Sequence, residues 1–203
     1  MATTTRRRAG NITISWSRFE NHRKTVLIGT SRRHPADRFI TATLHHNYYT
    51  RTVQRHPRVR YAKVDIYNNY VEGWGTDGSF GVDPTRYEDV TSGNGIVTTC
   101  GGQVLVEGNI FERKSYSQEA ALEYSASDDP AGSCKRGSAT YSNYGAGRSL
   151  NNWRRDGGGG LPTANSFQES LVFGRPYAAY SLQNNVQQNE AFRVQLMSLP
   201  GSK

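Results

Sequence analysis

The chain has 203 residues, which is enough for one domain with a buried core, and its formal net charge is +8. Its 21 glycines, 12 tyrosines and 35% hydrophobic residues favour a loop-rich β protein over a helical bundle. No apolar signal-peptide region follows Met1, and no apolar run is long enough to span a membrane, so we expect no membrane partner.

Positive charge is concentrated at the start of the chain. Residues 1–60 contain 13 Lys and Arg residues against 2 Asp and Glu residues, and they also contain all five His residues. Such a basic segment indicates an anionic partner, for which nucleic acid, anionic polysaccharide and acidic lipid are candidates at this point. A charge that serves only solubility is the alternative.

Short runs rich in β-branched residues recur along the first half of the chain. Polar segments with Gly or Pro separate the runs, so the pattern predicts strands rather than helices. The predicted strands cover residues 11–16, 24–29, 38–47, 59–69, 95–100 and 102–111.

A weak internal repeat marks the ends of several runs. A small or amide residue is followed by one spacer and then by a large apolar or aromatic residue. The instances are Ser17-Arg18-Phe19, Asn47-Tyr48-Tyr49, Asn68-Asn69-Tyr70 and Asn109-Ile110-Phe111. A repeat near 21 residues, with insertions, predicts a solenoid of β coils. Asparagine suits a coil corner because it tolerates left-handed backbone and its amide can bond a stacked asparagine.

The strand pattern stops after residue 112. Turn-forming residues dominate 113–165, and a short amphipathic helix is predicted around 187–197. We expect a single domain over 1–203, with coils over about 9–112 and a loop-rich excursion and covering segment over 113–203. Cys100 and Cys134 are too few for a disulfide scaffold, and they form either one bridge or two separate thiols.

Several segments, in order, resemble pectate lyases of polysaccharide lyase family 1. They read ITISWSRFENHRKTVLIG, ITATLHHNYY, QRHPRVRYAKVDIYNNYV and VLVEGNIFE, and the closing VFGRPYAAYSL is similar to the family's C-terminal segment. The arginine-proline element followed by the Y-N-N corner is specific. The resemblance implies a right-handed parallel β-helix in a secreted protein. It also implies cleavage of polygalacturonate by β-elimination, usually with Ca²⁺.

The resemblance also implies site residues. Arg55 falls on the family's catalytic arginine, which abstracts the C5 proton. Lys24 and Arg60 fall on basic residues that bind substrate carboxylates, and Arg58 is a further candidate for substrate contact. Lys24 is expected to open the strand at 24–29, one coil away, and to share the outward surface of Arg60.

Strand alternation in PRVRYAKV predicts that Val59 and Tyr61 face one side and Arg58 and Arg60 the other. Elimination from a uronate removes the proton alpha to a carboxylate, so fixed cations that neutralise the developing charge suit this chemistry. Free arginine has a pKa above about 12 and is a poor base near neutral pH, although neighbouring positive charges favour loss of its proton.

The chain departs from the family at its start. The family carries calcium-binding aspartates just before the strand that matches residues 11–16, where this sequence has MATTTRRRAG. We therefore expect an N-terminally truncated β-helix with an incomplete calcium site, no metal-ligating residues in this chain, and weak or absent lyase activity. The expected partner is an acidic polysaccharide, and the expected state is a monomer. Nucleic-acid binding is not expected because no recognised module is present.

Two other functions stay open from the sequence. A pectin lyase acts on methylated substrate without calcium, and Arg6–Arg8 would lie near the former metal site. The chain could also be a non-catalytic binder of anionic polysaccharide. His45 and His46 are expected as interior or corner residues rather than metal ligands, with one pointing inward and one outward.

Overall fold

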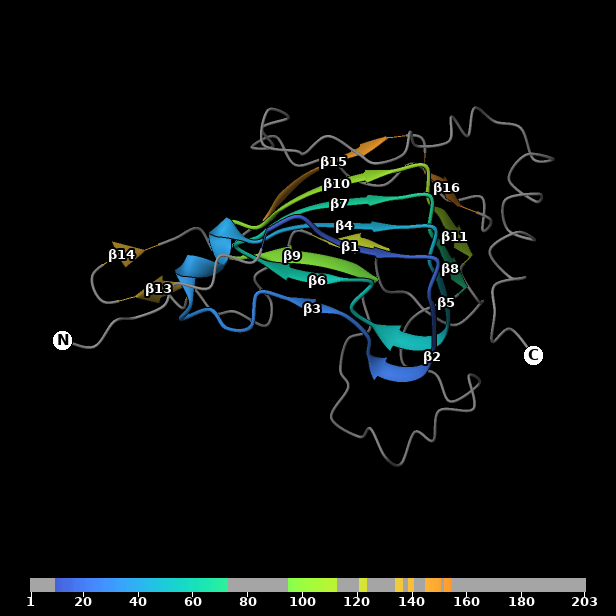
Figure 1. Cartoon of the computed structure of the whole chain (residues 1–203), viewed down its shortest axis with the longest axis horizontal. Coiled ribbons are helices and arrows are strands. Elements are labelled where there is room, and N and C mark those ends of the chain that lie inside the picture. Colours follow the sequence, from blue (N-terminus) through green and yellow to red (C-terminus); the bar gives the residue numbers. More distant parts are fainter. Residues whose placement is uncertain are drawn as a thin grey trace.

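The computed structural model describes residues 10–72, 95–112, 121–123, 134–136, 139–140, 145–150 and 152–154. Most of these residues form parallel strands, and the chain winds repeatedly through three sheets before returning to the first (Figure 1). The prediction of an all-β parallel β-helix is confirmed. The predicted helix at 187–197, the closing segment 172–182 and Arg6–Arg8 lie outside the described residues.

Each of the first four coils contributes one strand to each of three sheets, and the described part of the fifth coil contributes to the first two. The first sheet stacks β1 (Ile12–Ser15), β4 (Thr41–His45), β7 (Lys63–Tyr67), β10 (Gln103–Glu107) and β15 (Ala146–Leu150). The second stacks β2 (Arg18–Lys24), β5 (Tyr48–Gln54), β8 (Tyr70–Glu72), β11 (Ile110–Glu112) and β16 (Trp153–Arg154). The third stacks β3 (Leu27–Ile28), β6 (Arg58–Arg60), β9 (Ile96–Thr99) and β12 (Leu122–Glu123). The 3-10 helix Pro35–Phe39 and an antiparallel pair, β13 (Lys135–Arg136) with β14 (Ala139–Thr140), complete the described elements.

Several strand boundaries differ from the predicted ones. The polar segments 18–24 and 48–54 form β2 and β5, which hydropathy alone did not indicate. The predicted strand 59–69 splits into β6 and β7 at Tyr61, whose backbone is left-handed (φ 59°). The coils also continue to residue 154, farther than the expected 112, because β15 and β16 pair with β10 and β11.

Apolar side chains of successive coils stack inside the β-helix. One interior column runs from Phe19 through Tyr49 and Val71 to Phe111, with the Phe19 and Tyr49 rings stacked 4.8 Å apart. Parallel strands lie about 4.8 Å apart, so identical coil positions meet directly and the core is built one layer per coil.

An asparagine ladder joins the coils at the corner between the first and second sheets. The Asn47 amide nitrogen donates to Asn69 Oδ1 (3.0 Å), Asn69 to Asn109 Oδ1 (2.9 Å), and Asn109 to Asn152 Oδ1 (2.9 Å). The predicted corner asparagines are thus present, but the third repeat is shifted by one residue. Its ladder position is Asn69, and the sequence repeat missed the last asparagine of the ladder, Asn152.

The residues that precede this corner position in the first four coils explain that shift. Trp16, His46, Asn68 and Gly108 all have left-handed backbone, with φ between 51° and 60°. The chain turns at this residue, and the next one directs its amide along the stack. Asn68 therefore occupies the bend, where asparagine and glycine are the least strained residues, while Asn69 occupies the ladder.

His45 and His46 are both buried, which agrees with the expected interior or corner positions. Their Nδ1 atoms lie 2.7 Å apart, and one must donate to the other. The left-handed backbone of His46 folds its ring back over the corner, where it stacks on Trp16 (centroids 4.5 Å apart), while His45 stacks on Tyr67. Burial, followed by the neighbouring His45, lowers the pKa of His46 to about 4.

We expect this pair to make folding acid-sensitive. The pKa of His46 is lower in the folded chain than its ordinary 6.5, so the unfolded chain binds more protons between these values and stability falls as the pH drops from 6.5 to about 4. His46→Asn, which tolerates the left-handed backbone, should reduce the acid-side slope of the unfolding free energy by up to about 1.4 kcal/mol per pH unit.

Urea unfolding at a series of pH values measures this slope. The exposed His22, changed to Asn, serves as the control and should leave the slope close to that of the parent chain. An identical slope in the parent and His46→Asn chains would show that His46 does not cause the acid sensitivity.

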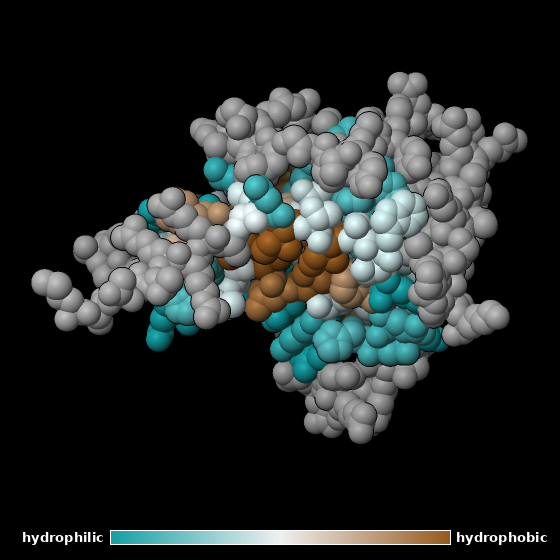
Figure 2. Space-filling view, in the orientation of Figure 1, coloured by the Kyte–Doolittle hydropathy of each residue, from teal (hydrophilic) through white to brown (hydrophobic). Residues whose placement is uncertain are grey.

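The first coil forms an edge of all three sheets, because β1, β2 and β3 each have a strand partner on one side only among the described residues. Hydrophobic surface gathers between β1 and β3, with polar surface over β2 (Figure 2). The large apolar side chains exposed in the described part of the chain are Ile12, Trp16, Leu27 and Phe39. In the same part, no helix is long and apolar enough to cross a membrane.

Candidate functional site

Lys24 lies at a corner of the β-helix rather than at the start of a strand. It is the last residue of β2 and pairs in register with Gln54, the last residue of β5. The backbone N–H of Thr25 then donates to Gln54 O (3.1 Å), and Val26 N–H donates to Arg55 O (3.0 Å). The expected strand beginning at Lys24 is therefore wrong, since β3 starts only at Leu27.

Arg55 occupies the same corner one coil later. Its backbone is left-handed (φ 69°), which is a sparsely populated conformation for a residue with a Cβ atom. The half-buried Arg55 is followed by His56 and Pro57, and Arg58 N–H then donates to Val26 O (3.0 Å). Val26 thus bonds to both sides of the Arg55 turn and holds it against the preceding coil.

Arg58 and Arg60 lie on β6 in the third sheet. Val59, between them, has no exposed surface and belongs to the core, so the two arginines lie on the opposite face of the strand, as predicted. Arg58 is nevertheless buried (3% exposed), whereas Arg60 is half-buried. Tyr61 was expected on the face of Val59, but it lies in a separate cluster with Cys100 and Cys134. Its left-handed backbone ends the strand and breaks the alternation.

Glycine is required beside Arg60. A Cβ atom on Gly29, whose φ is 82°, would lie 2.2 Å from the carbonyl oxygen of Arg60. The first and second coils therefore approach closely at this point, which places the backbone after β3 directly against the end of β6.

We call Lys24, Arg55, Arg58 and Arg60 the basic corner. The first two meet at one corner of adjacent coils, and the last two follow on the next strand. Residues 24–28 and 54–60, which form this region, contain no Asp or Glu. On β2 the acidic residue is Glu20, which is paired with Arg18 (2.9 Å) and with Arg51. The basic corner therefore combines four cationic residues, of which Arg58 is buried, with no acidic residue on its own segments.

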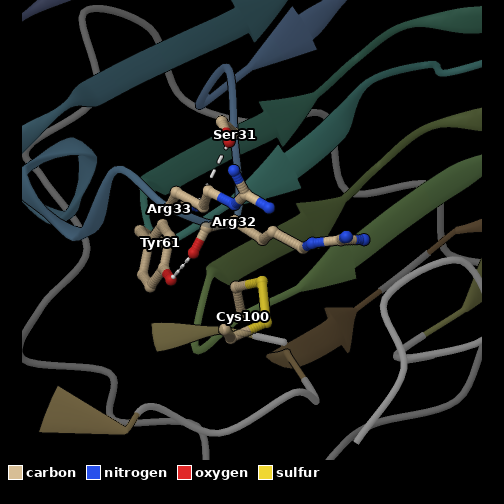
Figure 3. The surroundings of a disulfide bond; sticks show 6 residues. Ser31, Arg32, Arg33, Tyr61 and Cys100 are labelled. Atoms are coloured by element: carbon tan, nitrogen blue, oxygen red, sulfur yellow. Dashed lines mark hydrogen bonds between the residues drawn. A yellow bond between two sulfur atoms is a disulfide. The ribbon is translucent and has the colours of Figure 1, made fainter. Parts of the chain in front are cut away.

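A pair of arginines that the resemblance did not indicate follows β3. Tyr61 donates its hydroxyl hydrogen bond to the carbonyl oxygen of Arg32 (2.6 Å), and Arg33 N–H donates to Ser31 Oγ (3.2 Å). Figure 3 shows this turn beside the Cys100–Cys134 disulfide, with both arginine side chains extending from it. The sequence left open whether the two cysteines form a disulfide or remain separate thiols. The structure contains the disulfide, which joins residues 34 positions apart.

Three interior residues beneath Arg55 were also missed. His56 Nε2 lies 2.8 Å from Thr52 Oγ1, and the His56 ring meets the Tyr49 ring edge to face at 5.3 Å. Burial lowers the pKa of His56 to about 3, so its imidazole is neutral at physiological pH. The R-H-P-R string contained this histidine, but nothing in the sequence showed that it points inward.

The described residues do not fit a calcium ion. Calcium takes six to eight oxygen ligands, mostly from carboxylates, carbonyls and water. In the part of the chain that the structure describes, no three His, Cys, Asp or Glu side chains come together. The segment where the resemblance places the missing aspartates lies outside the described residues.

The stacked coils define a parallel β-helix. The family model described as pectate lyase matches residues 2–141, and the chain belongs to this family. No curated protein sequence matches the chain.

Solved structures show the same fold. The major allergen from cedar pollen is 20% identical, with a TM-score of 0.65, and the match covers 95% of this chain and 49% of that protein. A pectate lyase from Bacillus sp. N165, in complex with trigalacturonate, is 24% identical, with a TM-score of 0.51 and coverages of 93% and 48%. A pectate lyase from Acidovorax avenae subsp. citrulli is 19% identical, with a TM-score of 0.54 and coverages of 92% and 38%. The chain thus spans half or less of the length of each of these three proteins.

Proposed function

We propose that the basic corner binds the carboxylates of polygalacturonate and supports its cleavage by β-elimination. The observation that carries the proposal is the pairing of Lys24 with Gln54 and of Val26 N–H with Arg55 O, which sets Lys24 and Arg55 at one corner of adjacent coils. Membership of the pectate lyase family supports the reaction class. The trigalacturonate bound to a similar lyase supports an acidic polysaccharide as partner.

In the proposed reaction, the neutral form of Arg55 accepts the C5 proton of a uronate. The electron pair of that C–H bond forms a double bond between C4 and C5, and the C4–O bond breaks. The leaving oxygen departs with the other half of the polymer and takes a proton from solvent. Lys24 and Arg60 neutralise the charge that develops on the carboxylate, and Arg58 adds to the same positive field.

Calcium enters this proposal only as the ion that the family generally uses. The described residues form no cluster of carboxylates that would bind the ion, and no step of the proposed reaction uses it. We therefore propose that calcium-dependent turnover by the 203-residue chain is weak. The same observation favours a second candidate, a non-catalytic binder of anionic polysaccharide that uses the same cations.

We also propose that the protein is secreted and works as a monomer. The Cys100–Cys134 bridge supports an oxidising compartment, because structural disulfides form and persist outside the cytosol.

The experiment that tests the proposal is the absorbance of unsaturated product, with polygalacturonate or methyl-esterified pectin, each with and without Ca²⁺. We expect slow product formation from polygalacturonate, a rate that rises towards alkaline pH, and little response to Ca²⁺. Faster cleavage of esterified pectin would replace the proposal with the pectin lyase alternative. Binding of polygalacturonate without product formation would favour the non-catalytic binder. Robust calcium-dependent turnover would contradict the predicted incomplete metal site.

A further inference from the structure

His56 is held inside the coil from three directions. Its side chain is 1% exposed, its Nε2 contacts Thr52 Oγ1 at 2.8 Å, and its ring meets the edge-to-face Tyr49 ring at 5.3 Å. Its backbone N–H donates to Gly95 O on the next coil (2.9 Å). Thr52 itself has no exposed surface, so the contact lies in the interior. These contacts fix the position and orientation of the imidazole ring.

The surroundings of His56 select one protonation state. Among the described residues, its Nδ1 atom is buried and makes no hydrogen bond. A buried lone pair costs less than a buried N–H without an acceptor, so the proton belongs on Nε2, which donates to Thr52 Oγ1. A charged imidazole would bury a second N–H here, which agrees with a pKa lowered by burial to about 3.

The backbone next to His56 needs such an anchor. Arg55 adopts φ 69°, a strained conformation for a residue with a Cβ atom, which persists only when neighbouring structure holds it. Val26 holds the turn from the preceding coil, through Arg55 O and Arg58 N–H. His56 holds it from the interior and from the following coil. The turn that carries Arg55 is thus fixed between three successive coils.

We propose that His56 is a positioning residue, whose neutral imidazole, bonded to Thr52 and packed on Tyr49, fixes the backbone conformation from which Arg55 reaches the substrate. This inference rests on the proposed function for its consequence in catalysis. The positioning itself concerns the turn at residues 54–58 and can be measured in the chain without any substrate.

The test compares His56→Leu, which fills the space without polar atoms, with His56→Gln, whose amide can again bond Thr52. Thr52→Val removes only the hydroxyl. Thr98→Val is the matched control, because Thr98 is equally buried and its hydroxyl makes no hydrogen bond among the described residues. Two readouts are taken: hydrogen exchange of individual amides, and the kcat and KM of product formation at high enzyme concentration.

In His56→Leu we expect the Val26 and Arg58 amides to lose about tenfold or more of their protection relative to the amides of β7, which report global stability. We expect kcat to fall by about 10²-fold with KM changed less than threefold, because a misplaced catalytic group costs rate rather than binding. Thr52→Val should show the same pattern more weakly, His56→Gln should recover most of both readouts, and Thr98→Val should match the parent chain.

Equal loss of protection at Val26, Arg58 and β7 in every His56 and Thr52 variant would show a general stabilising role and would overturn the proposal. Unchanged protection at Val26 and Arg58 would overturn it too. If the parent chain forms no unsaturated product, the proposed function fails, whereas the exchange pattern still decides whether His56 positions the turn. Should His56→Leu fail to fold, Thr52→Val and His56→Gln give the same comparison.

Discussion

Replacing Arg55 by alanine should reduce kcat for eliminative cleavage by about 10²–10⁴-fold, while the affinity for oligogalacturonate changes only a few fold. Arg55 supplies the base in the proposed reaction, whereas Lys24 and Arg60 supply most of the attraction for the substrate carboxylates. Lys24→Gln should show the opposite pattern, with a larger loss of affinity than of kcat. Product absorbance gives kcat, and titration with trigalacturonate gives the affinity.

Arg51→Ala is the control for Arg55→Ala. Arg51 lies on β5, four positions before Arg55, is exposed, also has left-handed backbone, and pairs with Glu20. Its removal deletes the same charge from the same coil and should leave kcat within about twofold, since exposed ion pairs contribute little. Equal losses of rate in the two variants would mean that net charge, and not Arg55, governs the reaction. Full turnover in Arg55→Ala would remove Arg55 from the mechanism.

Asn69→Ala should destabilise the fold by about 3–5 kcal/mol, because it leaves several buried groups without partners. The Asn69 amide nitrogen donates to Leu44 O (2.9 Å), Tyr67 O (3.1 Å) and Asn109 Oδ1 (2.9 Å). Its Oδ1 accepts from both the backbone and the side-chain nitrogen of Asn47, each at 3.0 Å. One truncation therefore breaks the ladder between three coils. Chemical unfolding of the parent and variant chains measures the difference.

Asn21→Gly is the control for the ladder variant. Asn21 is also an asparagine within the coils, but it is exposed and has left-handed backbone (φ 53°), which glycine adopts readily. We expect a change within about 0.5 kcal/mol for this exchange. A comparable loss in both variants, or a loss below 1 kcal/mol for Asn69→Ala, would show that the stacked amides do not hold the coils together.

The sequence predicted the solenoid because its repeat records a corner where the first four coils make the same left-handed bend. It could not assign the ladder register, since Asn68 and Asn69 are adjacent and only the backbone shows which one bends and which one stacks. β2 was missed for a related reason. As the first strand of the second sheet it has one strand partner among the described residues, and its residues His22 and Lys24 remain exposed, so no apolar pattern marks it.

The sequence predicted candidate site residues by identity, whereas their geometry had to come from the structure. The spacing in RHPRVR located Arg55, Arg58 and Arg60 on the second coil, and the structure places all three where the chain leaves β5 and forms β6. Lys24 was expected at the start of the strand at 24–29, whereas it is the last residue of β2. The position of a strand boundary depends on hydrogen bonds between coils, here from Thr25 and Val26 to Gln54 and Arg55, and these join residues about 30 positions apart.

His56 shows the remaining limit of sequence reasoning. A histidine among three arginines suggests more surface charge, yet its side chain points inward to Thr52 and Tyr49. The left-handed turn at Arg55 interrupts simple alternation, so the face of each following residue has to be observed.

The central claim is that a row of cations on stacked coils meets the acid groups of a uronate polymer. A crystal structure of the Arg55→Ala chain with trigalacturonate tests it most directly. The account predicts carboxylates in contact with Lys24 and Arg60, and a C5 atom facing the space left by the Arg55 side chain. A sugar bound on another face of the β-helix, or ordered contacts that include neither Lys24 nor Arg60, would contradict it.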